Sequence, residues 1–290
     1  MNWHFRTIGM GTFNYRRAAK RLSQEVYATG RFKTSIGANE RFLKNSSTRF
    51  WKEHSNVLHS RTPGFGWWIW KPEFVKVCLD QIPRGDGLFY LDAGTVLGNS
   101  LEDLDLLDAL LKDGEIEPLI GSNSQSFAEY KYSSNALMSY CNLEDSQRTS
   151  NQFWAGFFMV QNNAPGITFV NSWKQMLCQD NHRFLINKED NFLENPDLIH
   201  HMYDQAVFSC LMKASMGKSI SIDETGQSGL IRPLRHRYGY GFFESPNCIR
   251  FFYHVLAFLS KVKLYVERRL ISNSLQMAPN NHSTNDLENP

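Results

Sequence analysis

A carboxylate at the end of an apolar segment is the most informative feature of the sequence. Residues 88–94 read LFYLDAG, and the apolar part is typical of a buried strand that ends at Asp92. Open α/β sheets bind ligands at the carboxyl ends of their strands, so Asp92 is a candidate ligand-binding residue. A second interpretation stays open from spacing alone, in which Asp92 only caps the turn that follows.

The glycine-rich segment GMGT at 9–12 follows the first predicted strand. Gly9, Gly11 and Thr12 could let the backbone approach a phosphate or a nucleotide base closely. The dinucleotide-binding pattern G-x-G-x-x-G is not met, because Asn14 stands at the position of the third glycine. A plain tight turn is therefore the other interpretation of this segment.

The segment GFGWWIWKP at 64–72 places tryptophans and a lysine beside two glycines. Trp70 and its neighbours could form a wall for a base or a sugar ring, with Lys71 meeting a phosphate. The alternative is an aromatic cluster packed under a loop.

Asp204 and Gln205 open a predicted helix directly after two histidines, His200 and His201. Adjacent histidines point in different directions, so this pair alone is weak support for a metal site. Asp204 could be a functional carboxylate or only a favourable partner of the helix dipole.

A loop at 232–241, RPLRHRYGYG, gathers several cations. Arg235 and Arg237 flank His236, and guanidinium groups in this arrangement suit a diphosphate. Solvated loop charge is the alternative.

The elements that must position these residues alternate between strands and helices over about 240 residues. This pattern favours a single α/β domain with a mainly parallel sheet flanked by helices. The predicted strands cover 5–8, 32–38, 88–94, 118–122, 153–161 and 218–223, and the predicted helices cover 15–27, 72–82, a leucine-rich segment capped by Ser100 and Asp103, a segment from Pro165, and 203–215. The polar residues 122–150 are predicted to form a mobile loop or a small insertion.

Taken in order, six blocks resemble a GT-A glycosyltransferase. They read FRTIGMGTFNYRRAAKRL, FGWWIWKP, LFYLDAG, FWAGFFMVQN, YDQAVFSCL and RHRYG, and they span residues 5 to about 243. They are similar to a group of bacterial and viral glycosyltransferases with GYWIWKP and YLDAG blocks, which is distantly similar to the glycogenin and lipopolysaccharide galactosyltransferase clan. The resemblance implies a GT-A (Rossmann-like) domain over 1–248 and a nucleotide-sugar donor, with a UDP-sugar favoured. It also implies a glycan or lipid-linked acceptor and a divalent metal, Mn²⁺ or Mg²⁺.

The resemblance also implies roles for individual residues. In the clan, a strand ending in Asp-Ala-Asp binds the metal and the sugar nucleotide. Asp92 and Ala93 match its first two positions, but Gly94 stands where the second carboxylate would be. The clan's His-x-x-Gly motif matches His236, which would be the second metal ligand, and its Asn-x-Gly strand matches Gly156 without the asparagine.

The clan's Asp-Gln helix start matches Asp204 and Gln205, which would face the donor sugar or the acceptor. If the reaction inverts the sugar, Asp204 is the candidate base. If no metal binds, Lys71, Arg235 and Arg237 would carry the charge of the leaving diphosphate.

The composition argues against several other classes of protein. The net charge is +2, from 31 basic and 29 acidic residues, which argues against a nucleic-acid partner. The cysteine count is five, which is odd, and no CxxC spacing occurs, so a disulfide framework or a zinc site is not expected. Without a signal-like segment or a long apolar run, the protein is expected to be cytoplasmic.

The positive charge is concentrated near the C-terminus, where 249–276 is predicted to form a basic amphipathic helix and 277–290 a disordered tail. Between 249 and 270 the charged residues are Arg250, Lys261, Lys263, Glu267, Arg268 and Arg269. The helix could lie peripherally on the inner face of a membrane or pack on the domain core.

Two other functions are compatible with these motifs. Because Gly94 replaces a metal-binding carboxylate, the chain could be a non-catalytic sugar- or nucleotide-binding protein with a GT-A-like domain. A methyltransferase also fits the GMG segment. That fold places a carboxylate at the end of its second strand, however, and Glu40 comes late for this role.

Overall fold

The computed structural model describes residues 1–185, 195–221 and 229–233. All of these residues belong to one compact unit, Met1–Glu244. The predicted C-terminal helix at 249–276 and the predicted tail at 277–290 lie outside the described residues.

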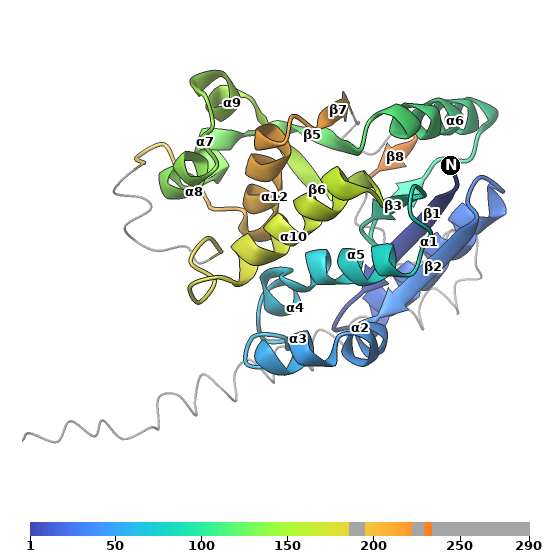
Figure 1. Ribbon diagram of the computed structural model, residues 1–290, viewed down its shortest axis with the longest axis horizontal. Helices are drawn as coiled ribbons and strands as arrows, with labels where there is room; N and C mark the ends of the chain where they lie inside the picture. Colours follow the sequence, from blue (N-terminus) through green and yellow to red (C-terminus); the bar gives the residue numbers. More distant parts are fainter. Residues whose placement is uncertain (186–194, 222–228, 234–290) are drawn as a thin grey trace, which may run out of the picture. The chain divides into compact units, whose positions relative to one another are not determined.

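Six strands form one mixed sheet in the order β2-β1-β3-β6-β5-β7 (Figure 1). Within this sheet, as far as the chain is described, only β6 runs against the other strands. The mainly parallel sheet expected from the sequence is thereby confirmed. A separate two-stranded sheet pairs β4 with β8. The strands are β1 (Trp3–Gly9), β2 (Thr34–Asn39), β3 (Gly87–Leu91), β4 (Val96–Leu97), β5 (Leu119–Ala128), β6 (Asn151–Gln161), β7 (Lys218–Ser221) and β8 (Ile231–Arg232).

The helices begin where the sequence offers capping groups. Thr12 caps α1 through its hydroxyl, and Ser100 and Asp103 form the expected capping box of α6. The described helices are α1 (Phe13–Ala28), α2 (Glu40–Ser46), α3 (Thr48–Glu53), α4 (Gly64–Trp67), α5 (Trp70–Asp80), α6 (Leu101–Ile116), α7 (Glu129–Tyr132), α8 (Asn135–Tyr140), α9 (Asp145–Thr149), α10 (Ala164–Cys178) and α12 (Tyr203–Ala214). None of them is long and apolar enough to span a membrane.

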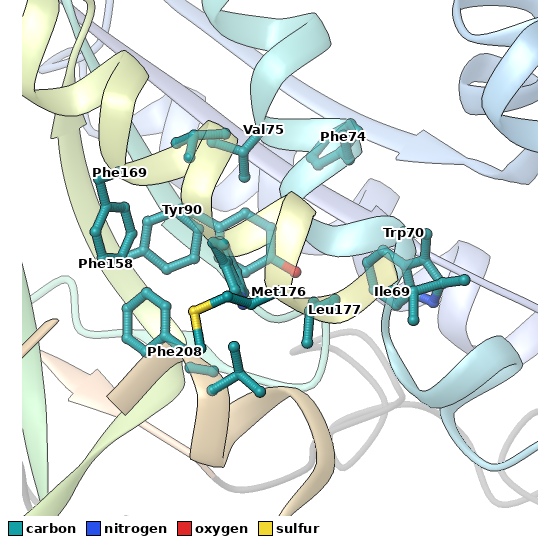
Figure 2. Packing of buried hydrophobic residues seen from close by; sticks show 14 of the residues in the cluster. Ile69, Trp70, Phe74, Val75, Tyr90, Phe158, Phe169, Met176, Leu177 and Phe208 are labelled. Carbon is teal, nitrogen blue, oxygen red and sulfur yellow. The ribbon is translucent and has the colours of Figure 1, made fainter. Parts of the chain in front are cut away.

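One face of the sheet packs against α5, α10 and α12. Tyr90 of β3 stacks on Phe158 of β6, with ring centroids 4.7 Å apart. Phe74 of α5, Phe169 of α10 and Phe208 of α12 belong to the same buried cluster, which Figure 2 shows. Burial of each such side chain stabilises the fold by about 1.5–3 kcal/mol.

The other face packs against α1 and α6. Side chains alternate along β3, so Phe89 and Leu91 point to this second cluster. Leu22 of α1 and Leu107 of α6 complete it. The sheet is therefore buried on both faces, which explains why β3 reads as an unbroken apolar run.

Of the two alternatives for 122–150, the mobile loop is wrong. β5 extends to Ala128, and the short helices α7, α8 and α9 follow it. Several polar side chains of this segment are buried and bind each other inside the protein. Glu129 is fully buried and pairs with Lys213 of α12, with 2.8 Å between Oε2 and Nζ.

Candidate functional site

Two neighbouring parallel strands, β1 and β3, end at the same edge of the sheet. Arg6 pairs with Tyr90, so the segments that begin at Gly9 and Asp92 both leave this edge. A Cβ atom on Gly9 would lie 2.0 Å from the Tyr15 carbonyl oxygen, so α1 can approach only because this residue is glycine. Gly11 has φ +82°, and Thr12 begins the helix at once. The structure thus places the predicted GMGT segment beside Asp92 as a tight turn into α1.

Asp92 continues β3 by one residue. Its backbone N–H donates to the Gly156 carbonyl oxygen at 2.8 Å, and its own carbonyl accepts from the Thr95 N–H at 2.9 Å. Its carboxylate instead accepts from the Tyr90 hydroxyl, with 2.8 Å between the oxygens, and its side chain is 34% exposed. The turn is therefore closed by backbone groups, and the carboxylate of Asp92 faces the edge of the sheet. Gly156, the predicted donor-binding glycine of β6, lies directly beside it.

Arg21 of α1 stabilises the turn at 92–95. Its guanidinium donates to the carbonyl oxygens of Ala93 and Thr95, at 3.1 and 2.7 Å. Ala93 is buried against α1, whereas Gly94 is partly exposed in the turn. Arg21 could not be predicted as a neighbour of this turn, because nothing in its spacing links α1 to residues 93–95.

Lys71 connects two carboxylates that are more than a hundred residues apart in the chain. Its Nζ atom lies 3.3 Å from Oδ1 of Asp92 and 3.0 Å from Oδ2 of Asp204, and it donates to the Ala155 carbonyl oxygen at 3.1 Å. The Lys71 side chain is 3% exposed and that of Asp204 is 7% exposed. Three residues predicted from separate motifs therefore meet in one group, the Lys71 centre, defined as Lys71, Asp92 and Asp204.

Burial and charge set the protonation of the Lys71 centre. Burial raises the pKa of Asp204 to about 6; Lys71 opposes this shift and Asp92 adds to it. Burial lowers the pKa of Lys71, but the two carboxylates outweigh burial and leave the pKa above its usual value. Burial and the Asp92 carboxylate raise the pKa of Tyr90, so its hydroxyl stays a hydrogen-bond donor. Near neutral pH the centre therefore contains one cation and up to two anions.

The tryptophan segment before Lys71 has an unusual backbone. Phe65, Trp67 and Trp68 have φ values of 58°, 50° and 61°, which bulky residues rarely adopt. Trp70 is buried, and its indole N–H donates to the Gly64 carbonyl oxygen at 2.9 Å. Trp70 thus closes the segment on itself instead of offering an exposed wall, and the packed-cluster interpretation fits this ring.

Gln205 lies at the end of a chain of buried amide and carboxylate groups. Its Nε2 atom donates to Oε1 of Gln152 at 2.9 Å. The Gln152 amide in turn donates to Glu129 and Ser133, at 3.0 and 2.9 Å. Because both of these acceptors bind the nitrogen of Gln152, its oxygen must face Gln205. The sequence did not predict this chain of hydrogen bonds, although Gln152 is a polar residue that directly precedes the apolar run of β6.

The described donor set does not fit a divalent cation on its own. Oδ1 of Asp92 already contacts the Tyr90 hydroxyl and the Lys71 ammonium, and a second cation close to Lys71 would be repelled by it. In residues 1–185, 195–221 and 229–233, no group of three His, Cys, Asp or Glu residues is arranged to hold a metal. His236, the other predicted ligand, lies outside these ranges, as do Arg235 and Arg237.

Comparisons with known proteins give distant structural resemblances. Neither a protein-family model nor a curated protein matches the sequence. The apo form of mouse xyloside xylosyltransferase 1 aligns with a TM-score of 0.41 and 10% identity, over 78% of this chain and 86% of that one. The galactosyltransferase LgtC, in complex with donor and acceptor sugar analogues, aligns with a TM-score of 0.35 and 14% identity, over 76% and 73% of the two chains. At TM-scores below 0.5, neither resemblance fixes the activity of this chain.

Proposed function

We propose that this chain is a glycosyltransferase that moves a sugar from a nucleotide-diphosphate donor, with a UDP-sugar favoured, to a glycan or lipid-linked acceptor. The observation that carries the proposal is the Lys71 centre at the carboxyl edge of the sheet. In open α/β sheets this edge is where ligands bind. The order of sequence blocks that resembles GT-A glycosyltransferases supports the same assignment.

Asp92 is the residue of the Lys71 centre that can touch the donor. It is the most exposed of the three, and its carboxylate is oriented by the Tyr90 hydroxyl and the Lys71 ammonium. The glycine turn of β1 and the backbone at Gly156 lie beside it. We assign Asp92 to donor binding, through the donor's hydroxyl groups.

Asp204 has a different role from the one the sequence indicates. A base must reach the acceptor hydroxyl, but the side chain of Asp204 is only 7% exposed and lies against Lys71. Its contacts favour a positioning role, in which Asp204 fixes the Lys71 ammonium and Lys71 fixes Asp92. Gln205, the next residue, is partly exposed and remains a candidate for contact with the sugar.

The Lys71 centre does not supply the positive charge that a diphosphate needs. With Lys71 protonated and both carboxylates ionised, it contributes a net charge of −1. The leaving diphosphate must therefore be stabilised by other groups. The predicted candidates are Arg235 and Arg237 or a divalent cation, Mn²⁺ or Mg²⁺, held with help from His236.

The proposal also covers location. We infer a cytoplasmic protein, with peripheral contact to the inner face of a membrane through the predicted basic helix at 249–276. This contact would suit a lipid-linked acceptor.

Turnover of a panel of UDP- and GDP-sugars tests the proposal, with release of the nucleoside diphosphate as the readout. Asp92→Asn should lower turnover by about 100-fold or more, because an electrostatic contact made in the site is lost. Asp105→Asn is the matched control, since Asp105 is an exposed carboxylate on α6. Equal turnover by the two variants, at equal melting temperature, would reject the role of Asp92.

A non-catalytic nucleotide- or sugar-binding protein is the second candidate. The burial of Asp204 and the glycine at position 94 favour it, because both remove groups that would act on the substrates. UDP binding without turnover of any donor, with or without added sugar acceptors, would support this candidate over the transferase.

A further inference from the structure

A cavity of about 350 Å³ lies apart from the Lys71 centre. It is lined by residues of α3, of the tryptophan segment and of the turn after α10. Its volume is at the lower end of the range of small-molecule sites, about 300–1,000 Å³, which suits a ligand of one or two rings. The lining residues that matter here are Glu53, His54, Asn56, Trp67, Asn181 and His182.

Three flat rings form part of this lining. The centroid of the His182 ring lies 5.4 Å from that of His54 and 5.9 Å from that of Trp67. Burial, with a smaller effect of His182, lowers the pKa of His54, so this imidazole is uncharged near neutral pH. An uncharged aromatic surface of this kind packs well against the C–H face of a sugar ring.

The polar groups of the lining can bind hydroxyl groups. The Nδ1 atom of His182 is 2.7 Å from the Leu177 carbonyl oxygen. A carbonyl oxygen only accepts, so Nδ1 of His182 carries a proton and donates it to this bond. The amides of Asn56 and Asn181 each add donors and an acceptor, and Glu53 adds a carboxylate. Donors and acceptors around an aromatic surface match the chemistry of a polyhydroxylated ligand.

Other ligand classes fit this lining poorly. It includes no lysine or arginine, and its Glu53 carboxylate already pairs with Arg49 at 2.7 Å, so the lining itself supplies no cation for a phosphate or a nucleotide. The described part of the chain holds no three-residue metal cluster there. Burial raises the pKa of the neighbouring Cys178 thiol to about 12, so no thiolate is present for covalent chemistry. Among the ligand classes compared with this lining, an uncharged carbohydrate fits it best.

The position of the cavity links it to the proposed reaction. Trp67 and Lys71 are four residues apart in the chain, so their Cα atoms are separated by at most ~15 Å. Between them, the ring of Trp68 lies 6.1 Å from that of Tyr203, the residue before Asp204. The left-handed backbone of this segment allows one short stretch of chain to supply both Trp67 to the cavity and Lys71 to the centre.

We propose that this cavity, lined by Trp67, His54, His182 and Asn56, binds an uncharged sugar residue of the carbohydrate acceptor. That a sugar binds here is inferred from the lining residues alone. That this sugar belongs to the acceptor rests on the proposed transferase function.

Saturation-transfer NMR with methyl glycosides of glucose, galactose, mannose and N-acetylglucosamine tests the site directly, without turnover. At least one glycoside should bind the full-length protein, and Trp67→Ala should weaken that binding roughly tenfold. Trp67→Phe keeps an aromatic face and should retain binding within about threefold. Asn56→Ala should weaken it several-fold, while Asn171→Ala, an exposed site on α10, should not change it. Because Asn56 is exposed, this variant keeps the test valid if Trp67→Ala does not fold.

The outcomes separate this site from the donor site. UDP affinity should be the same in the wild type, Trp67→Ala and Asn56→Ala. Absence of binding by all four glycosides would overturn the proposal, and so would binding that neither Trp67→Ala nor Asn56→Ala changes. If glycoside binding depends on Trp67 but the protein binds neither UDP nor GDP, the result would support the sugar site and contradict the transferase function.

Discussion

Lys71 is a buried cation whose charge is balanced by two carboxylates from distant parts of the chain. A lysine with 3% of its side chain exposed is stable only when paired, because removing an ammonium from water costs several kcal/mol. Asp204 and Asp92 supply that pairing, and the Ala155 carbonyl oxygen accepts a hydrogen bond. The lysine therefore serves two purposes, since it neutralises Asp204 inside the protein and orients Asp92 at the edge of the sheet.

Replacement of Lys71 by methionine should be strongly destabilising. The variant leaves the buried Asp204 carboxylate without a cation, which should lower the free energy of unfolding by about 3 kcal/mol or more. Lys76→Met is the matched control, because Lys76 lies on the same helix at 41% exposure and its pair with Asp80 is on the surface. Denaturant unfolding measures both variants. Similar, small losses for the two would contradict the assigned charge balance.

Asp204 should titrate near neutral pH instead of near pH 4. Its pKa is about 6 in the folded protein, against 3.8 for an ordinary aspartate, chiefly because it is buried. The folded state thus binds this proton more tightly than the unfolded chain, so the group favours folding at low pH and loses that contribution as pH rises through about 6. In ¹³C NMR of protein labelled at the aspartate carboxyl carbons, one resonance should titrate near pH 6. That resonance should be missing in Asp204→Asn, and its titration near pH 4 would contradict the account.

Individual site residues could be predicted from the sequence, but their contacts could not. Asp92, Lys71 and Asp204 each stand out in a separate motif. Only the folded chain shows that Lys71 lies between the two carboxylates and that Trp70 is buried. The contact between Tyr90 and Asp92 could have been predicted, because residues two apart in a strand share a face and Tyr90 precedes Asp92 by two.

At the scale of elements, a pair of buried charges attaches α7 and α9 to α12. Glu129 of α7 is fully buried and Lys213 of α12 is 5% exposed, and the lysine also donates to the carbonyl oxygen of Gln147 at 2.8 Å. Gln152 connects the same carboxylate to Gln205. The segment at 128–150 therefore supports the start of α12, where Asp204 lies.

Loss of this pair should loosen the segment and destabilise the fold. Lys213→Met leaves Glu129 as an unpaired buried charge, so the free energy of unfolding should fall by about 3–5 kcal/mol. In hydrogen exchange, the amides of α7, α8 and α9 should lose protection more than those of β1 and β3. Lys218→Met is the control, because Lys218 pairs with Asp113 on the surface at 39% exposure. Unchanged protection of α7, α8 and α9 in the folded variant would show that the pair does not hold them.

The sequence predicted the regular elements better than this polar segment. Continuous apolar runs mark β3 and β6, and helical apolar spacing marks α10 and α12, because these elements are buried by apolar contacts. The segment at 122–150 is held by buried polar pairs as well as by apolar side chains such as Leu137 and Met138. Glu129, Ser133 and Gln152 look like loop residues until their partners are known.

At the scale of the whole domain, the alternation of strands and helices predicts an α/β fold with a mainly parallel sheet, which the structure confirms. The reversed direction of β6 could not be predicted, because an apolar strand reads the same for either direction. This reversal brings the 154–156 segment of β6 beside the end of β3. The carbonyl oxygens of Ala155 and Gly156 thereby reach Lys71 and the backbone of Asp92.

The central claim, that this edge of the sheet binds a nucleotide-sugar donor through Asp92, is tested most directly by calorimetric titration. The full chain is titrated with UDP and with GDP, each with and without Mn²⁺, and the experiment is repeated with Asp92→Asn and the control Asp105→Asn. We expect UDP to bind the wild type and the control equally, and Asp92→Asn to weaken binding by about tenfold or more, a loss of about 1.4 kcal/mol. Binding of neither nucleotide under any condition, or equal affinity in Asp92→Asn, would contradict the account.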